Sequence, residues 1–131
     1  MVVDSSAIVA IIVEEEEREL FQNLILRTPT VVMSVVTLVE CSIVLAGKRT
    51  KYDPARLDDT ISTLRIDVRA VDLHQGELAR VAFAQFGRGS GTAQLTFGDC
   101  FAYALAKARE DTLLFKGDDF LKTDVVPAWR P

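Results

Sequence analysis

The chain alternates short strand-like segments with stretches of helical spacing, and this alternation constrains its fold more than any other feature. The strand-like segments lie at 2–4, 31–33, 68–71 and 112–115, with a shorter candidate at 125–126. Continuous apolar strands are typical of a sheet covered on both faces, and strands that alternate with helices favour parallel pairing. With right-handed crossovers, we predict an α/β fold of three layers, α/β/α, around a mainly parallel sheet of four to five strands.

Helix boundaries support this order of elements. Residues that cap helix N-termini precede most of the helical stretches, and Pro54 stands where a first helical residue is expected. Thr96 and Asp99 have the spacing of a capping box, and Gly47 ends the helix that Ser34 begins. We expect a helix from Ser5 or Ser6 to 12 and a second one with the acidic run 14–19 near its start, where negative charge suits the helix dipole. Further helices are expected at 35–46, 54–64, 73–86 and 97–109.

Length and composition indicate a single globular domain, 1–131. The chain has 131 residues, of which 49% are hydrophobic and 26% charged, and a net charge of -4. This charge argues against nucleic-acid binding through bulk positive charge, although a local site stays possible. The longest apolar run, 7–13, falls far short of the ~20 residues of a membrane span. No signal-like start is evident, so we expect no membrane partner and a cytoplasmic location.

Acidic residues gather at the predicted carboxyl edge of the sheet, where open α/β sheets bind ligands. Asp4 ends the first strand, Glu40 lies in the helix after the second, and Asp99 lies in the first turn of the helix before the fourth. Asp118 and Asp119 directly follow that fourth strand. Each acid also has an ordinary local explanation, as a helix cap, a solvated helix residue or a turn residue. Their convergence on one edge indicates a site.

A cluster of carboxylates without a basic partner repels itself, and a divalent cation relieves that repulsion. Ligands that are all oxygen suit Mg²⁺, or Mn²⁺, better than zinc. Such a metal activates water and stabilises the charge on a phosphoryl group during in-line attack. The acids therefore predict a metal-dependent nuclease.

Four sequence strings stand in order along nearly the whole chain: Met1–Ala7, Ser34-x-x-Thr37-x-x-Glu40, Phe97–Ala106 (FGDCFAYALA) and Leu114–Phe120 (LFKGDDF). Together they resemble the PIN-domain ribonucleases, and more closely the VapC-type toxins of toxin–antitoxin pairs. The resemblance implies a PIN-like fold and an endoribonuclease that hydrolyses RNA phosphodiester bonds with metal-activated water. It also implies a homodimer and an antitoxin protein that covers the acidic site, often with a basic side chain.

The resemblance also implies roles for individual residues. Asp4, Glu40 and Asp99 would bind Mg²⁺. Gly117 stands where many relatives carry the fourth acid, so either Asp118 or Asp119 would take that role, with Asp118 slightly favoured, or the fourth role is weakened. Hydroxyl residues would hold the acids or a metal-bound water: Ser5 and Ser6 at Asp4, Thr37 at Glu40, and Thr96 at Asp99.

Other reactive residue types suggest less. Arg88 and Lys116 lie near predicted rim segments and are candidate RNA phosphate contacts, with solvated surface as the ordinary alternative. The aromatic residues, including Phe97 and Phe101, have the spacing of core residues, so we predict no base-stacking platform. We expect Cys41 and Cys100 to be small core residues, and the single histidine, His74, to cap a helix or lie on the surface.

Two alternatives remain open at this stage. A phosphoryl-transfer domain of the receiver or dehalogenase-like kind also places an aspartate after its first strand, but Lys116 is the only weak match to its further requirements. A non-catalytic module could keep the fold and bind only a partner. The set of intact acids favours the nuclease over both.

Overall fold

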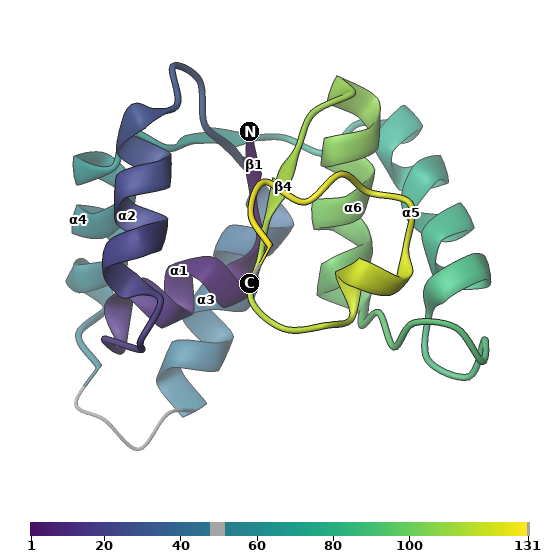
Figure 1. The fold of residues 1–131 in the computed structure, drawn as a ribbon, viewed down its shortest axis with the longest axis horizontal. Helices are drawn as coiled ribbons and strands as arrows, with labels where there is room; N and C mark the ends of the chain where they lie inside the picture. Colours follow the sequence, from purple (N-terminus) through teal and green to yellow (C-terminus); the bar gives the residue numbers. More distant parts are fainter. Residues whose placement is uncertain (48–51, 131) are drawn as a thin grey trace.

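The computed structural model describes residues 1–47 and 52–130, and its elements alternate as the sequence predicts (Figure 1). In this part of the chain the elements, in order, are β1 (Val2–Val3), α1 (Ser5–Ile12), α2 (Arg18–Arg27), β2 (Val32–Ser34), α3 (Val35–Gly47), α4 (Pro54–Thr63), β3 (Asp67–Arg69), α5 (Leu73–Phe86), α6 (Phe97–Arg109), β4 (Leu113–Leu114) and the 3₁₀ turn η1 (Phe120–Lys122).

The strands form a four-stranded sheet with the order β3-β2-β1-β4, and every pair is parallel. Val2 is aligned with Val32 on one side and with Leu113 on the other. The predicted parallel sheet is confirmed, and it has four strands rather than five. The expected fifth strand at 125–126 is wrong: the chain makes only an isolated parallel bridge between Leu113 and Pro127, in which Leu113 bonds to the backbone of Val126 and of Ala128.

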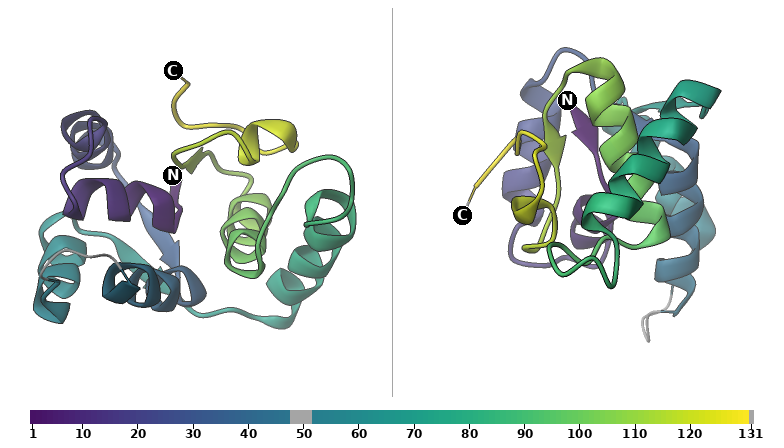
Figure 2. Two further views of the ribbon diagram at one scale, coloured as in Figure 1. Left: turned by 90° about the horizontal axis from the view of Figure 1, so that it is seen from below. Right: turned by 90° about the vertical axis from the view of Figure 1, so that its right-hand side faces the viewer.

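Successive residues of each strand point to opposite layers, as the two-residue period of a strand requires. Val2, Val32 and Leu113 pack with α5 and α6 in one cluster, whereas Val3, Met33 and Leu114 pack with α1–α4 in the other. Figure 1 shows the first four helices on the left and α5 and α6 on the right of the sheet, and Figure 2 shows the same division from two further sides. The three-layer arrangement is therefore confirmed.

Side-chain caps fix where several helices begin. Asp53 accepts a hydrogen bond from the N–H of Ala55 at 3.0 Å, and Asp72 accepts one from the N–H of Gln75 at 2.8 Å. Residues 14–17 of the acidic run lie in the connection to α2, where Glu14 has a positive φ of 63° that a helix does not allow. The second helix begins at Arg18, and of the run only Glu19 lies in its first turn.

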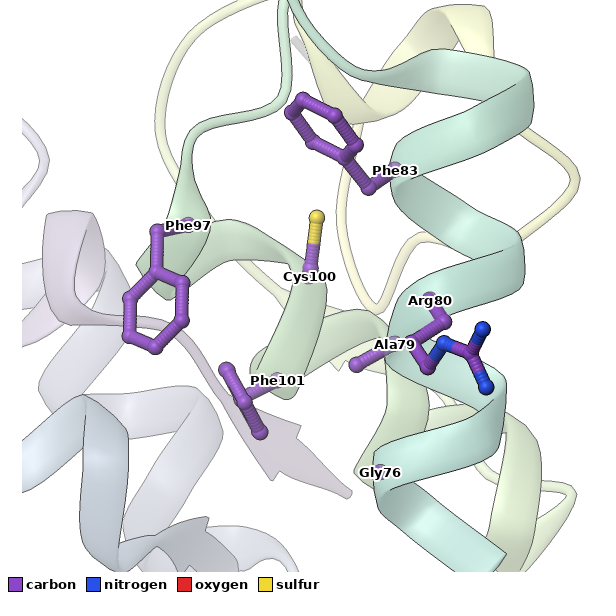
Figure 3. A pocket seen from close by; sticks show the side chains of 7 residues that line it. All are labelled: Gly76, Ala79, Arg80, Phe83, Phe97, Cys100 and Phe101. Atoms are coloured by element: carbon purple, nitrogen blue, oxygen red, sulfur yellow. The ribbon is translucent and has the colours of Figure 1, made fainter.

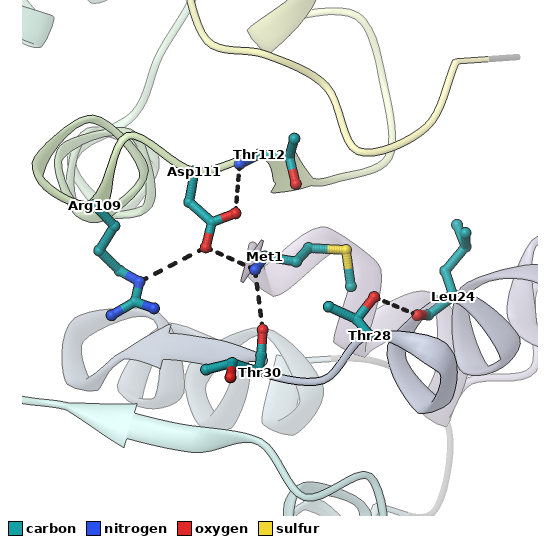
Figure 4. Close-up of polar contacts among 7 residues, drawn as sticks. All are labelled: Met1, Leu24, Thr28, Thr30, Arg109, Asp111 and Thr112. Carbon is teal, nitrogen blue, oxygen red and sulfur yellow. Dashed lines mark hydrogen bonds and ion pairs between the residues drawn. The ribbon is translucent and has the colours of Figure 1, made fainter.

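The start of β1 is anchored at the edge of the sheet opposite to the predicted site. The amino group of Met1 donates to the backbone oxygen of Thr30 at 3.0 Å and forms a salt bridge of 2.7 Å with Asp111 (Figure 4). Asp111 also contacts Arg109 at 3.7 Å. These contacts tie the first strand to β2 and to the end of α6. Among the described residues, no helix is long and apolar enough to cross a membrane.

Candidate metal-dependent active site

Asp4 lies at the carboxyl end of β1 and is also the N-cap of α1. Its Oδ2 accepts hydrogen bonds from the N–H of Ser6 at 2.9 Å and from the Ser6 hydroxyl at 2.6 Å. Only 2% of Asp4 is exposed, and its Oδ1 has no hydrogen-bond partner. A buried carboxylate oxygen without a partner is costly, so this atom is one to which a ligand would bind favourably.

Glu40 approaches the same region from α3. The hydroxyl of Ser5 donates to its Oε1 at 2.8 Å, so consecutive serines hold two different acids. Its other oxygen, Oε2, lies against the backbone of Gly98 in the first turn of α6. A Cβ atom at position 98 would overlap with Oε2, so only glycine allows this approach.

Asp99 lies one residue further along α6, and it is part of a complete capping box. Its Oδ2 accepts from the N–H of Thr96 at 2.7 Å, while its own N–H donates to the Thr96 hydroxyl at 3.3 Å. The capping explanation of Asp99 is therefore correct. It does not compete with a role in the site, because the same carboxylate acts electrostatically on Asp4 and on Glu40.

The three carboxylates disfavour one another's charge. Burial raises the pKa of Asp4 to about 7, and the negative charges of Asp99 and Glu40 add to this rise, although the two Ser6 hydrogen bonds oppose it. Burial and Asp99 also raise the pKa of Glu40. None of the three forms a salt bridge within the described part of the chain. Among the described residues, no positively charged side chain offsets the repulsion between the carboxylates, so the site favours the binding of a cation.

The donor set fits a hard divalent cation. All three side chains offer oxygen, which suits Mg²⁺ or Mn²⁺, and the orphaned Oδ1 of Asp4 is an available donor. In residues 1–47 and 52–130, no group of three or more His, Cys, Asp or Glu side chains is already closed into a metal-binding arrangement. A cation would therefore have to draw the three mutually repelling carboxylates closer together.

Other predicted site residues lie differently. The hydroxyl of Thr37 is buried without a hydrogen-bond partner, and the expected contact to Glu40 comes from Ser5 instead. Asp118 and Asp119 are exposed on the turn after β4. Their backbone oxygens accept from the N–H groups of the following 3₁₀ turn, and no hydrogen bond in the described structure brings either side chain to the other acids.

The two candidate phosphate contacts differ in their surroundings. The ammonium group of Lys116 is bound to Glu15 and Glu17, each at 2.8 Å, whereas Arg88 is exposed in the loop after α5. The backbone N–H of Lys116 donates to the Ser6 hydroxyl at 2.9 Å. Lys116 thus braces the serine that holds Asp4, a contact for which its side-chain type gave no signal.

Gly98 is a further functional position that the sequence reasoning missed. A glycine within a helix is unfavourable by about 1 kcal/mol relative to alanine. Its presence at the start of a predicted helix could therefore have indicated, from the sequence alone, that a larger side chain does not fit there. Its cause is visible only in three dimensions, because Glu40 is distant in sequence.

The PIN-domain model matches residues 1–126. This chain belongs to the PIN-domain family. It is 41% identical over 126 residues to the Ribonuclease VapC28 of Mycobacterium tuberculosis, a match that covers 95% of both chains. A solved PIN-domain neighbour is the M. tuberculosis VapC20, described as a Sarcin-Ricin loop cleaving toxin; it has a TM-score of 0.75 and 18% identity and covers 99% of this chain and 98% of that one. A toxin–antitoxin complex from Klebsiella pneumoniae matches with a TM-score of 0.70 and 15% identity over 99% and 98% of the two chains.

Proposed function

We propose that this PIN domain, 1–131, is a Mg²⁺-dependent endoribonuclease that acts as the toxin of a toxin–antitoxin pair in the cytoplasm. The observation that carries the proposal is the set of Asp4, Glu40 and Asp99, in which the pKa values of Asp4 and Glu40 are raised and which has no cationic partner among the described residues. The ribonuclease names of its relatives support the choice of RNA as substrate.

Bound Mg²⁺, or Mn²⁺, would polarise a water and neutralise charge on the phosphoryl group. The protein supplies the preorganisation. Ser6 fixes Oδ2 of Asp4 and leaves Oδ1 for the cation, Ser5 holds one oxygen of Glu40, and the capping box orients Asp99. Because hydrogen bonds hold one oxygen of each acid, part of the cost of ordering these side chains is met during folding, and binding has only to draw the carboxylates closer together.

The decisive experiment is the cleavage of purified total RNA by the protein with Mg²⁺, with EDTA, and after Asp99→Asn. We expect cleavage only by the wild type with Mg²⁺. Asparagine can still accept the Thr96 N–H, so the variant keeps its fold, which circular dichroism checks. Asp59→Asn, an exposed acid on α4, is the matched control and should cleave normally. Wild-type cleavage by Asp99→Asn would show that the site is misassigned, and Mg²⁺ binding without cleavage would favour the non-catalytic module.

The fourth acid is open to the same assay. We propose that Asp118 or Asp119 approaches the site once a cation and RNA are bound, with Asp118 favoured. A loss of cleavage in Asp118→Asn, but not in Asp119→Asn, is the expected outcome. Equal activity of both variants would leave the site with three acids.

We further propose a homodimer and an antitoxin protein as partners. Val35, Val39 and Ile43 follow one another at four-residue spacing along α3 and stay exposed, Ile43 to 68%. An exposed apolar stripe of this kind is typical of a protein interface, and we assign it to the second copy. The antitoxin would bind over the three acids with a basic side chain, which is the charge complementary to them. Ile43→Glu should convert a dimer into a monomer in sedimentation velocity, and an unchanged mass would refute the assignment.

A further inference from the structure

A groove of about 400 Å³ lies between α5 and α6. Small residues form its floor and aromatic rings its walls, with Phe83 and Phe97 on either side of Cys100 (Figure 3). The lining consists of Gly76, Ala79, Arg80, Phe83, Phe97, Cys100 and Phe101. A volume of this size is that of a pocket for a small molecule or a single nucleotide.

The rings of this groove are available to a ligand. Phe97 is 74% exposed and Phe83 is 55% exposed. Phe97 meets Phe101 edge to face, with ring centroids 5.0 Å apart, so one ring supports the other. The prediction from the sequence that these aromatic residues belong to the core is therefore wrong for Phe97.

The groove and the carboxylate site share the first turn of α6. Phe97 is the first residue of α6, Gly98 contacts Glu40, Asp99 carries the third acid, and Cys100 lies on the floor of the groove. At 100° per residue, Phe97 and Cys100 lie on one side of this turn and Asp99 on the other. A phosphate held at the acids would therefore lie across this turn from the groove, at a distance of about one helix diameter, ~10 Å.

We propose that the groove binds an unstacked base of the single-stranded RNA next to the scissile phosphate. This inference rests on the proposed function. Aromatic rings bind bases by stacking, and this mode tolerates any sequence because every base has a flat face. The proposal places substrate recognition beside the reacting phosphate, on a chain whose net charge of -4 gives little general attraction for RNA.

Arg80 supplies the positive charge of the groove. It lies in the lining with an exposed side chain and pairs with Glu77 at 3.0 Å on the same helix. An exposed ion pair of this kind contributes little to stability, so a backbone phosphate of the RNA can replace Glu77 as the partner of Arg80. The flat rings and this cation match a nucleotide, whereas the aliphatic stripe on α3 matches a protein surface.

The test measures RNA binding in EDTA, where no cleavage occurs, by the anisotropy of a fluorescent ten-nucleotide single strand. Phe97→Ala should raise Kd by about tenfold to a hundredfold, the range expected for the loss of one stacked base. Phe97→Trp keeps a ring and should bind as the wild type does. Leu26→Ala, on the exposed face of α2, is the matched control and should also be unchanged.

An RNA with an abasic residue gives a second readout. The abasic position that meets the groove should weaken wild-type binding by the same factor, and it should have no further effect on Phe97→Ala. An unchanged Kd for Phe97→Ala, in a protein that binds and cleaves RNA, overturns the groove proposal and leaves the proposed function intact. A loss of dimer mass at unchanged Kd identifies the groove as a protein interface and also overturns it. A wild type that neither binds nor cleaves RNA overturns both proposals.

Discussion

Asp4 should make the metal-free protein less stable as the pH rises. Its pKa is raised from 3.8 to about 7 in the folded state, so between these values the folded protein holds one proton more than the unfolded chain. Stability then falls by about 1.4 kcal/mol for each pH unit. Between pH 5 and pH 7 the loss is about 2 kcal/mol, and a further loss of less than about 0.5 kcal/mol follows above pH 7 as the folded-state carboxyl finishes titrating. The sign is opposite to that of an acid held in a salt bridge.

Asp4→Asn isolates this effect, because asparagine has no charge to bury and its amide oxygen can still accept from Ser6. The assay is urea unfolding in EDTA at pH 5 and pH 8 for both proteins. We expect the stability of the variant relative to the wild type to rise by about 3 kcal/mol from pH 5 to pH 8. Saturating Mg²⁺ at pH 8 should stabilise the wild type, because a ligand that binds only the folded state does so, and the variant should respond weakly.

The outcome that refutes this reasoning is the same pH dependence for both proteins. It would mean that Asp4 is solvated or already neutralised in the folded state. A variant that unfolds at both pH values would instead point to an unsatisfied buried amide, and Asp4→Ser is then the substitute comparison, since serine is a common helix N-cap.

Two further perturbations follow from the packing around the site. Gly98→Ala should displace the carboxylate of Glu40, with which its Cβ overlaps. Because this carboxylate is the flexible end of a side chain, the variant should lose little stability without metal, but it should shrink the Mg²⁺-dependent rise in Tm. The control Gly76→Ala, where nothing lies within 4 Å, should leave that rise unchanged, and equal effects of the two would contradict the crowding argument. Lys116→Ala and Glu17→Gln should each lower the free energy of unfolding by less than about 1 kcal/mol. The double variant should lower it by no more than the larger of the two single changes. If the two single changes instead add up in the double variant, Lys116 and Glu17 do not interact.

The layers, and the convergence of three acids on one candidate site, could be predicted from the sequence because both follow from local patterns. Strand and helix periods, caps and the carboxyl-edge rule place Asp4, Glu40 and Asp99 without any three-dimensional knowledge. The contacts between distant segments could not be read in this way. That Ser5 rather than Thr37 holds Glu40, and that Phe97 is exposed, depend on how α3, α5 and α6 pack. The expected fifth strand failed for a similar reason, because an apolar pair does not reveal whether it meets a ladder.

In Asp99 a single carboxylate both caps a helix and belongs to the candidate site. Its carboxylate closes the capping box that begins α6, and the same carboxylate faces Asp4 and Glu40. A relative that had lost all nuclease activity would still be under selection to keep an acid at this position, since helix caps contribute about 1 kcal/mol. The persistence of this aspartate in a diverged sequence is therefore weak evidence of activity, whereas the glycine before it, which helix formation alone does not require, is the more telling residue to look for.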